Sequence, residues 1–159
     1  MNEYRIRPAM VQDLATVLHH RRRMFEDMGY KDPLSLDAML ATSGPLIQRG
    51  LEEGKYRGWL VVAPGGGVVA GGGIIFLEFQ SHPRDPRPQR AWVVNMFTEP
   101  EHRRRGLARL LMKTMLEWCR NAGMEFLYLH ASDDGRPLYE SLGFKPTNEM
   151  RLALGITQP

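Results

Sequence analysis

The sequence has little of what would place it outside the ordinary class of globular proteins. Its 159 residues include a single cysteine, Cys119, so no disulfide can form within the chain. No apolar run approaches the roughly 20 residues of a membrane-spanning helix, and the opening Met-Asn-Glu-Tyr-Arg has no signal-peptide core. We therefore expect a cytoplasmic protein without a membrane partner, in which Cys119 is a small packed thiol.

Strong charge of either sign is also missing. The formal net charge is +3 at pH 7, and basic residues gather in two short clusters, residues 21–23 and 103–105. No aromatic residues are interleaved with them, so no nucleic-acid partner is predicted, and residues 21–23 are expected at a solvated helix end. His19 and His20 lack metal-ligand spacing, so we predict no metal site and expect both in surface or edge packing.

What the sequence does contain is the composition of one folded domain. Hydrophobic residues make up 43% of the chain and charged residues 25%, a balance typical of globular proteins. A chain of 159 residues can bury a sizeable core but is too short for two ordinary domains. We therefore predict that residues 1–159 form a single domain.

The most informative stretch runs from residue 91 to residue 123. It begins with Ala-Trp-Val-Val-Asn-Met-Phe-Thr, which is typical of a buried strand, and Pro100 ends that strand because proline supplies no ladder donor. Further on, apolar residues recur every three or four positions and predict one face of a helix: Leu107, Leu110, Leu111, Met115 and Trp118. Gly123 suits the end of that helix.

The turn between this strand and helix has the character of an anion site. The first N–H groups of a helix have no intrahelical partner, and the helix dipole adds partial positive charge there. Gly106 lets a ligand approach the backbone without meeting a Cβ atom, and Arg103, Arg104 and Arg105 bring full charges beside it. The sequence therefore predicts a turn that binds phosphate.

The remaining elements alternate between strand and helix patterns. Expected strands are residues 4–7, 59–63, 68–70, 74–79, 125–130 and 150–154, and expected helices are residues 11–28, 34–41, 45–53 and 132–142. Residues 43–45, Ser-Gly-Pro, are expected to break the second helical region. The order predicts an α/β protein with layers around a mixed sheet.

Two further segments leave alternatives open. The run Gly71-Gly72-Gly73 interrupts a strand pattern, and tight packing or a bulge explains it better than phosphate binding, because no helix follows. Residues 81–90 hold three prolines and must form a loop. That loop either contacts a substrate through Arg84 or Arg87 or is an exposed linker.

Three motifs resemble one known family. Arg103-x-x-Gly106-x-Ala108 resembles the pyrophosphate-binding motif Arg/Gln-x-x-Gly-x-Gly/Ala of the GNAT superfamily of acyl-CoA-dependent N-acetyltransferases. The segment Leu-Tyr-Glu-Ser-Leu-Gly-Phe at 138–144 resembles its second signature, and residues 6–14 resemble its usual opening. The resemblance spans nearly the whole chain and implies a single-domain GNAT-like fold, in which helices flank a mixed, mostly antiparallel sheet of about six to seven strands.

The resemblance also implies an activity and the residues that perform it. The enzyme would transfer the acetyl group of acetyl-CoA to a primary amine of a small molecule or protein by direct attack. Tyr139 stands at the position of the general acid, and a tyrosine, with a pKa of ~10, remains protonated at neutral pH until it donates to the departing thiolate. The residues implied to contact acetyl-CoA are Met96, Phe97, Thr98, Arg103, Arg104, Arg105, Gly106, Leu107, Ala108, Arg109 and Ser132.

Several roles stay open at this point. Glu78 is the candidate base, with Glu99 and a chain of waters as alternatives. Asn95 either contacts the acceptor or braces a bulge, Ser132 is alternatively a helix cap, and Arg109 alternatively lies on an exposed helix face. The rival function is a catalytically silent, CoA-binding regulatory or interaction module, because a fold does not determine a function. The acceptor amine is not identified, and both a monomer and a homodimer remain possible.

Overall fold

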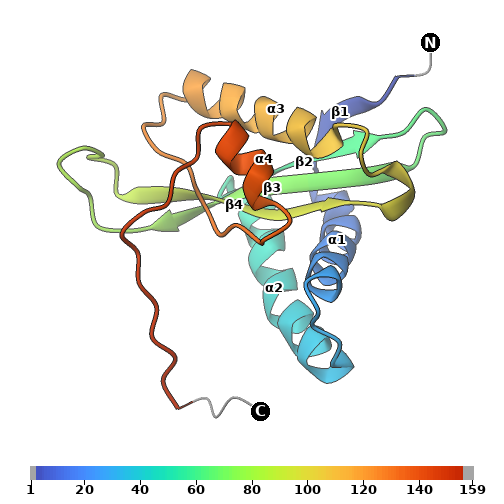
Figure 1. Cartoon of the computed structure of the whole chain (residues 1–159), viewed down its shortest axis with the longest axis horizontal. Helices are drawn as coiled ribbons and strands as arrows, with labels where there is room; N and C mark the ends of the chain where they lie inside the picture. Colours follow the sequence, from blue (N-terminus) through green and yellow to red (C-terminus); the bar gives the residue numbers. More distant parts are fainter. Residues whose placement is uncertain (1–2, 156–159) are drawn as a thin grey trace.

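A mixed sheet runs through the middle of the molecule, in a computed structural model that describes residues 3–155 (Figure 1). Five strands lie in chain order across the sheet in these residues: β1 (Arg5–Pro8), β2 (Tyr56–Val62), β3 (Val68–Glu78), β4 (Gln89–Thr98) and β5 (Tyr128–Leu129). All neighbouring strands are antiparallel except β4 and β5, which are parallel because a helix crosses between them. The α/β class is confirmed, whereas the expectation of about six to seven strands was wrong.

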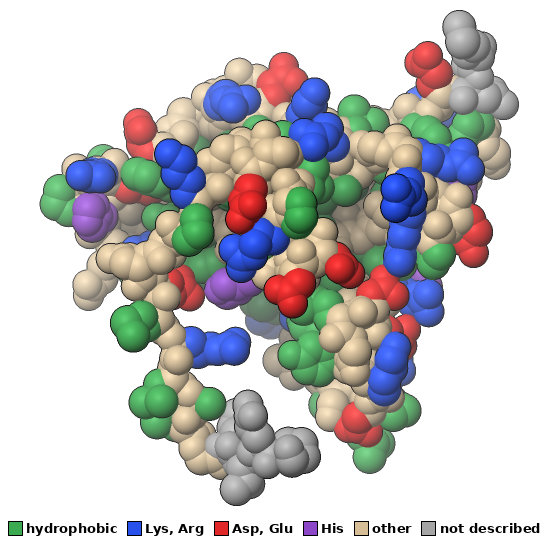
Figure 2. All heavy atoms as spheres, viewed as in Figure 1, with side chains coloured by type: hydrophobic (Ala, Val, Ile, Leu, Met, Phe, Trp, Pro, Cys, Tyr) green, Lys and Arg blue, Asp and Glu red, His purple; other side chains and the backbone are tan. Residues whose placement is uncertain are grey.

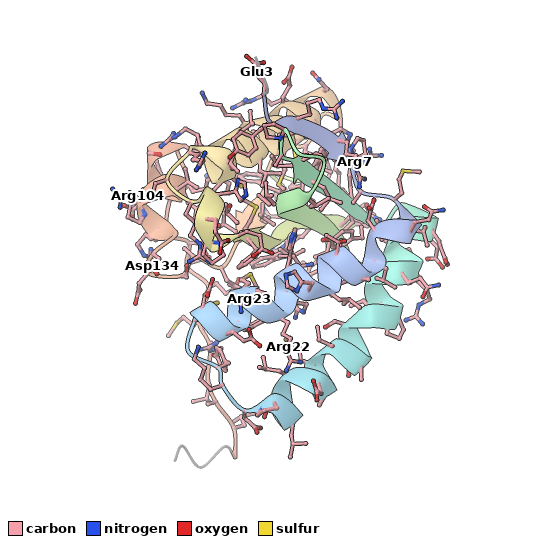
Figure 3. The ribbon with its side chains drawn as sticks, turned by 90° about the vertical axis from the view of Figure 1, so that its right-hand side faces the viewer. Glu3, Arg7, Arg22, Arg23, Arg104 and Asp134 are labelled. Carbon is pink, nitrogen blue, oxygen red and sulfur yellow. The ribbon has the colours of Figure 1, made fainter. Side chains whose placement is uncertain are left out.

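Helices cover both faces of this sheet. The α1 (Leu14–Asp27) and α2 (Pro33–Glu53) helices lie on one face, and α3 (Leu107–Asn121) lies on the other with the short α4 (Arg136–Ser141) beside it (Figures 1 and 3). Short 3-10 helices, η1 (Val11–Asp13) and η2 (Pro100–His102), precede α1 and α3. No helix in the part of the chain that the structure describes is both long and apolar enough to cross a bilayer.

The face covered by α3 holds the larger core. The residues of α3 that it buries are Leu107, Leu111, Met112, Met115 and Cys119, which pack against side chains of β2, β3 and β4. This confirms the expected apolar face, except that Leu110 is 41% exposed. Cys119 is a packed thiol as expected, and burial raises its pKa to about 11.

The opposite face holds a smaller core between the sheet and α1 and α2. Val17, Ile47 and Tyr56 form its centre. The expected break of the second helical region was wrong, because α2 runs without interruption through Pro45. Buried positions lie on both sides of that proline, including Gly44 against Leu18 of α1, so tertiary packing outweighs the one donor that proline removes.

The glycine run belongs to one continuous strand, so the expected interruption of β3 was also wrong. The three glycines leave room for side chains from both faces of the sheet: His20 at Gly71, Met96 at Gly72 and Tyr56 at Gly73. A Cβ atom at Gly71 would lie 2.8 Å from the His20 ring. A register shift in the pairing with β4 occurs between Gly71 and Gly73, so the expectation of tight packing or a bulge is confirmed.

The expected final strand, residues 150–154, does not form. After Gly143 the chain turns so that Phe144 packs against Tyr139, and then it extends away from the body of the protein (Figure 1). Met150 is 94% exposed, and Leu152 and Leu154 are each 79% exposed. The adjacent edge strand β5 has only two residues, which gives the segment no long ladder to join.

Candidate functional site

The central feature of the candidate site is a bulge in β4. Two residues, Asn95 and Met96, oppose the single residue Gly72, as the flanking pairs show: Val94 with Gly73, and Phe97 with Gly71. Asn95 has a φ of 59°, a left-handed conformation that asparagine tolerates better than most residues. The bulge shifts the alternation of side chains by one residue, so Phe97 faces His20 of α1 instead of the core under α3.

Beyond the bulge, one edge of β4 is open. The parallel pairing of β4 with β5 consists of Trp92 with Tyr128 and Val93 with Leu129, while β4 continues to Thr98. Within residues 3–155 no strand pairs with this edge from residue 94 onward. The backbone groups of residues 96–98 therefore offer a ladder that an extended ligand carrying amide groups can join.

This open edge leads to the start of α3. Arg104 and Gly106 both have left-handed φ values, 61° and 79°, which bend the chain sharply before Leu107 is buried in the core. No side chain caps the helix, and a Cβ atom at Gly106 would meet nothing within 4 Å. The turn thus has the uncapped N–H groups and the open approach that an anion site needs. Arg104 lies at the periphery, on the same side of the molecule as Asp134 (Figure 3).

Two arginines of the predicted site have structural partners. The guanidinium of Arg103 donates to the carbonyl oxygen of Thr98 over 2.9 Å and to Asp27 of α1 over 2.6 Å. Arg109 donates to the hydroxyl of Ser141 in α4 over 2.8 Å. Arg103 therefore ties the turn to α1, and Arg109 ties α3 to the helix that carries Tyr139.

Tyr139 lies on α4 and is partly buried. Its ring packs on the α3 core and meets the Phe144 ring edge-on at 5.9 Å, while burial raises its pKa above the usual range. No hydrogen bond of its hydroxyl is found within residues 3–155, and burial is the only cause of its pKa shift. Since no fully buried side-chain oxygen in these residues lacks a partner, the hydroxyl is accessible to a ligand. Nearby, the Ser132 hydroxyl accepts from the Gly135 backbone over 3.1 Å, in the turn that precedes α4, while α4 itself has no side-chain cap.

The two candidate bases lie at different distances from the bulge. Glu78 is exposed at the end of β3 and pairs with Gln89, six residues before Asn95 on β4, about 20 Å along the strand. The structure therefore does not bring Glu78 to the bulge. Glu99 follows β4 directly and holds His19 over 2.9 Å.

The loop between β3 and β4 has a structural contact of its own. Arg87 donates to the carbonyl oxygens of Ala122 and Gly123 at the end of α3. This contact anchors the loop at the C-terminal end of α3, whereas the turn formed by residues 103–106, here called the anion turn, lies at the N-terminal end of the same helix. Because Arg87 is engaged in this contact, the structure does not support its role in contacting a substrate. The same contact shows that the loop is not a free linker.

A polar network adjoins the bulge, and of its members the sequence-based site included Asn95 but not Tyr56, Arg21 or Ser43. Asn95 donates to the Tyr56 hydroxyl over 3.0 Å and accepts from Arg21 over 3.0 Å, and Arg21 also donates to Ser43 over 3.1 Å. Burial raises the pKa of Tyr56 to about 12 and lowers the pKa of Arg21. The expectation of a solvated helix end for residues 21–23 was therefore wrong for Arg21.

The two histidines of α1 also differ from each other. His20 is 2% exposed, and burial lowers its pKa to about 4, whereas His19 is exposed and contacts Glu99. No group of three or more His, Cys, Asp or Glu side chains in the described part of the chain is arranged to hold a metal ion.

Comparisons with known proteins agree with this geometry. A GCN5-related N-acetyltransferase from Ralstonia eutropha is 33% identical, with 96% of this chain and 99% of that chain covered and a TM-score of 0.88. A predicted acetyltransferase from Clostridium acetobutylicum, solved with acetyl-CoA, has the same fold with a TM-score of 0.84 at 22% identity over 96% of each chain. Human N-acetyltransferase 8 is 33% identical over 66 residues, which are 40% of this chain and 29% of that protein.

A family profile supports the same assignment over a longer part of the chain. The profile of the Acetyltransferase (GNAT) family matches residues 15–144, from α1 to the last residue of the second signature. The match therefore includes the bulged strand, the basic turn and the helix that carries Tyr139. This chain belongs to the Acetyltransferase (GNAT) family.

Proposed function

We propose that the protein is an N-acetyltransferase that transfers the acetyl group of acetyl-CoA to a primary amine. The observation that carries the proposal is the open edge of β4 leading to the uncapped start of α3. A long ligand with amide groups at one end and a diphosphate at the other suits this path. The acetyl-CoA bound to the Clostridium acetobutylicum protein of the same fold supports the choice of ligand.

Each part of acetyl-CoA has a proposed position along this path. The pantetheine arm pairs with the backbone of residues 96–98, and the diphosphate receives hydrogen bonds from the N–H groups that open α3, with Arg104 and Arg105 adding charge. Arg103 and Arg109 act mainly by holding the turn and α4 in place. This binding directs the thioester towards the bulge at Asn95.

Tyr139 is the proposed general acid. The amine nitrogen attacks the thioester carbonyl carbon, the C–S bond breaks, and the sulfur takes the proton of the Tyr139 hydroxyl. Solvent then returns a proton to the phenolate. Burial raises the pKa of this tyrosine, so it is protonated before the reaction and carries no charge beside the apolar residues on which it packs.

The proton of the attacking amine is proposed to leave through water. Glu78 lies too far along the sheet to accept it directly, as its pairing with Gln89 shows. A free alkyl amine, with a pKa of ~10.4, is neutral in roughly one molecule in a thousand at pH 7. The rate should therefore rise with pH until the bound amine is mostly neutral.

Acetyl-CoA binding and acetyl transfer are tested separately. Isothermal titration calorimetry with acetyl-CoA measures the first, and release of free thiol in the presence of a panel of primary amines measures the second. Binding together with thiol release and formation of N-acetyl product supports the enzyme. Binding without product for any amine would instead favour a silent CoA-binding module.

Replacing Tyr139 with Phe tests the general acid. We expect kcat to fall about 100-fold, while the affinity for acetyl-CoA is unchanged, because only proton donation is lost. Tyr128→Phe is the matched control, since this tyrosine stacks on Trp92 at the paired end of β5 and should retain full activity. An unchanged kcat in Tyr139→Phe would remove the residue from this role.

A further inference from the structure

Arg21 lies between three elements on the side of the sheet that α1 and α2 cover. Its guanidinium donates to Ser43 of α2 and to Asn95 at the β4 bulge, and it sits over the Phe25 ring at 5.1 Å from the ring centre. These contacts hold the side chain in one orientation. The cation is therefore fixed against the residue that begins the bulge.

Arg21 has no acidic partner, unlike the arginines beside it. Arg22 pairs with Glu26 and Asp37, which places it between α1 and α2, and Arg23 pairs with Glu26 (Figure 3). Within residues 3–155 no carboxylate forms an ion pair with Arg21. All three arginines are half-buried, and Arg21 is the one whose guanidinium lies in a setting that lowers its pKa and that lacks a counter-ion.

This arrangement destabilises the folded protein when no ligand is bound, and an anionic ligand would offset that loss. Withdrawing a guanidinium from water without an opposite charge is unfavourable, and the lowered pKa of Arg21 reflects that loss of hydration. Its two protein contacts use two of its five donors, and both accept through neutral oxygens. The Nη2 nitrogen has no partner within the described residues, and it is accessible because no fully buried nitrogen there lacks a partner.

We propose that Arg21 binds an anionic group on the amine acceptor, so that the substrate class is amines carrying a carboxylate or a phosphate. This rests on the proposed function, because it places the acceptor on the α1 and α2 side of the bulge. The planar guanidinium, already aligned by Ser43 and Asn95, presents its free donors to a two-oxygen anion. The amine of the same molecule then points to the thioester at the bulge.

Matched pairs of acceptors measure this preference directly. The ω-amino acids from glycine to 6-aminohexanoate are compared with their amides, and the natural α-amino acids with theirs. Rates are compared at equal concentrations of neutral amine, so that each pair differs mainly in the charge of one group. Phosphoethanolamine against ethanolamine separates phosphate from carboxylate. For at least one chain length we expect kcat/KM to be about tenfold or more higher for the anionic member.

Substitutions then assign the preference to Arg21. Arg21→Met should reduce the ratio of kcat/KM for the acid to kcat/KM for the amide to about one. Structural damage alone would lower both values and leave their ratio unchanged. Arg23→Met is the matched control and should keep the wild-type ratio. Ser43→Asp places a carboxylate beside Arg21, so it should also abolish the preference. This second variant decides the question if Arg21→Met does not fold.

The outcomes separate this proposal from the proposed function. Acetylation of amides and acids at equal rates, or of amides alone, would overturn the role of Arg21 and leave the acetyltransferase standing. A preference that survives in both Arg21→Met and Ser43→Asp would overturn it as well. Failure to bind acetyl-CoA would overturn both.

Discussion

His20 is a buried residue that makes the stability of this fold depend on pH. Its ring lies against Phe97 at 5.3 Å between centres and fills the space that Gly71 leaves in β3. Burial lowers its pKa to about 4, with the nearby His19 as a second cause, and Glu99 opposes the shift. The imidazole is therefore neutral at pH 7, when the site is expected to work.

The stability of the protein should fall as pH decreases from about 6.5 to about 4. The unfolded chain binds a proton on His20 near pH 6.5 and the folded one near pH 4, so in this window the unfolded state holds more protons and acid favours it. The loss should reach on the order of 3 kcal/mol, measured by urea unfolding at several pH values. His20→Phe should show a smaller loss over the same window, whereas His19→Gln should resemble the wild type. Equal slopes for all three proteins would contradict the assignment.

Residue types alone did not separate buried polar groups from exposed ones. Arg21 lies four residues after Val17 and four before Phe25, so it occupies the apolar stripe of α1. That spacing indicates that Arg21 faces the protein interior, but the three consecutive arginines favoured a solvated helix end. Whether Asn95 contacts the acceptor or braces a bulge depended on the opposite strand, which the residue pattern of β4 does not show.

The strand, turn and helix from β4 to α3 form the element on which the proposed acetyl-CoA binding depends. This unit was predictable because local rules agree there: a β-rich run, a proline, a glycine and an apolar period of three or four. The break in α2 and the interruption of β3 were predicted wrongly for the opposite reason. At Pro45 and Gly71-Gly72-Gly73, packing from other elements overrides the local preference.

Gly106→Val should weaken acetyl-CoA binding about tenfold or more, because a side chain would enter the open approach to the N–H groups of α3. The substitution also strains a left-handed residue by about 1–2 kcal/mol. Gly66→Val, in the turn between β2 and β3, has the same kind of strain and open space and serves as the matched control. Calorimetry with acetyl-CoA should show a loss of affinity only at position 106. Equal affinity in the two variants would argue against the anion turn.

At the scale of the whole molecule, the proposed site lies where the layers meet. The α3 layer supplies the anion turn, the opposite layer supplies Arg21, and the sheet between them supplies the bulge (Figures 1 and 3). The sequence predicted one domain with helices around a mixed sheet, because strand and helix patterns alternate along it. It could not show where β4 loses its pairing with β5, because that depends on the length of β5 in the folded protein.

The C-terminal segment carries apolar side chains, and their contribution to stability shows whether they are buried against a second copy of the chain. Apolar side chains line the segment that descends from the body, at Met150, Leu152 and Leu154, and all three are mostly exposed (Figure 2). Replacing the three together with Ser should therefore change the free energy of unfolding by no more than about 0.5 kcal/mol per site. Urea unfolding of wild type and variant at two protein concentrations measures this. A larger loss that grows with concentration would show that these side chains are buried against a second copy, because only an assembly makes stability depend on concentration.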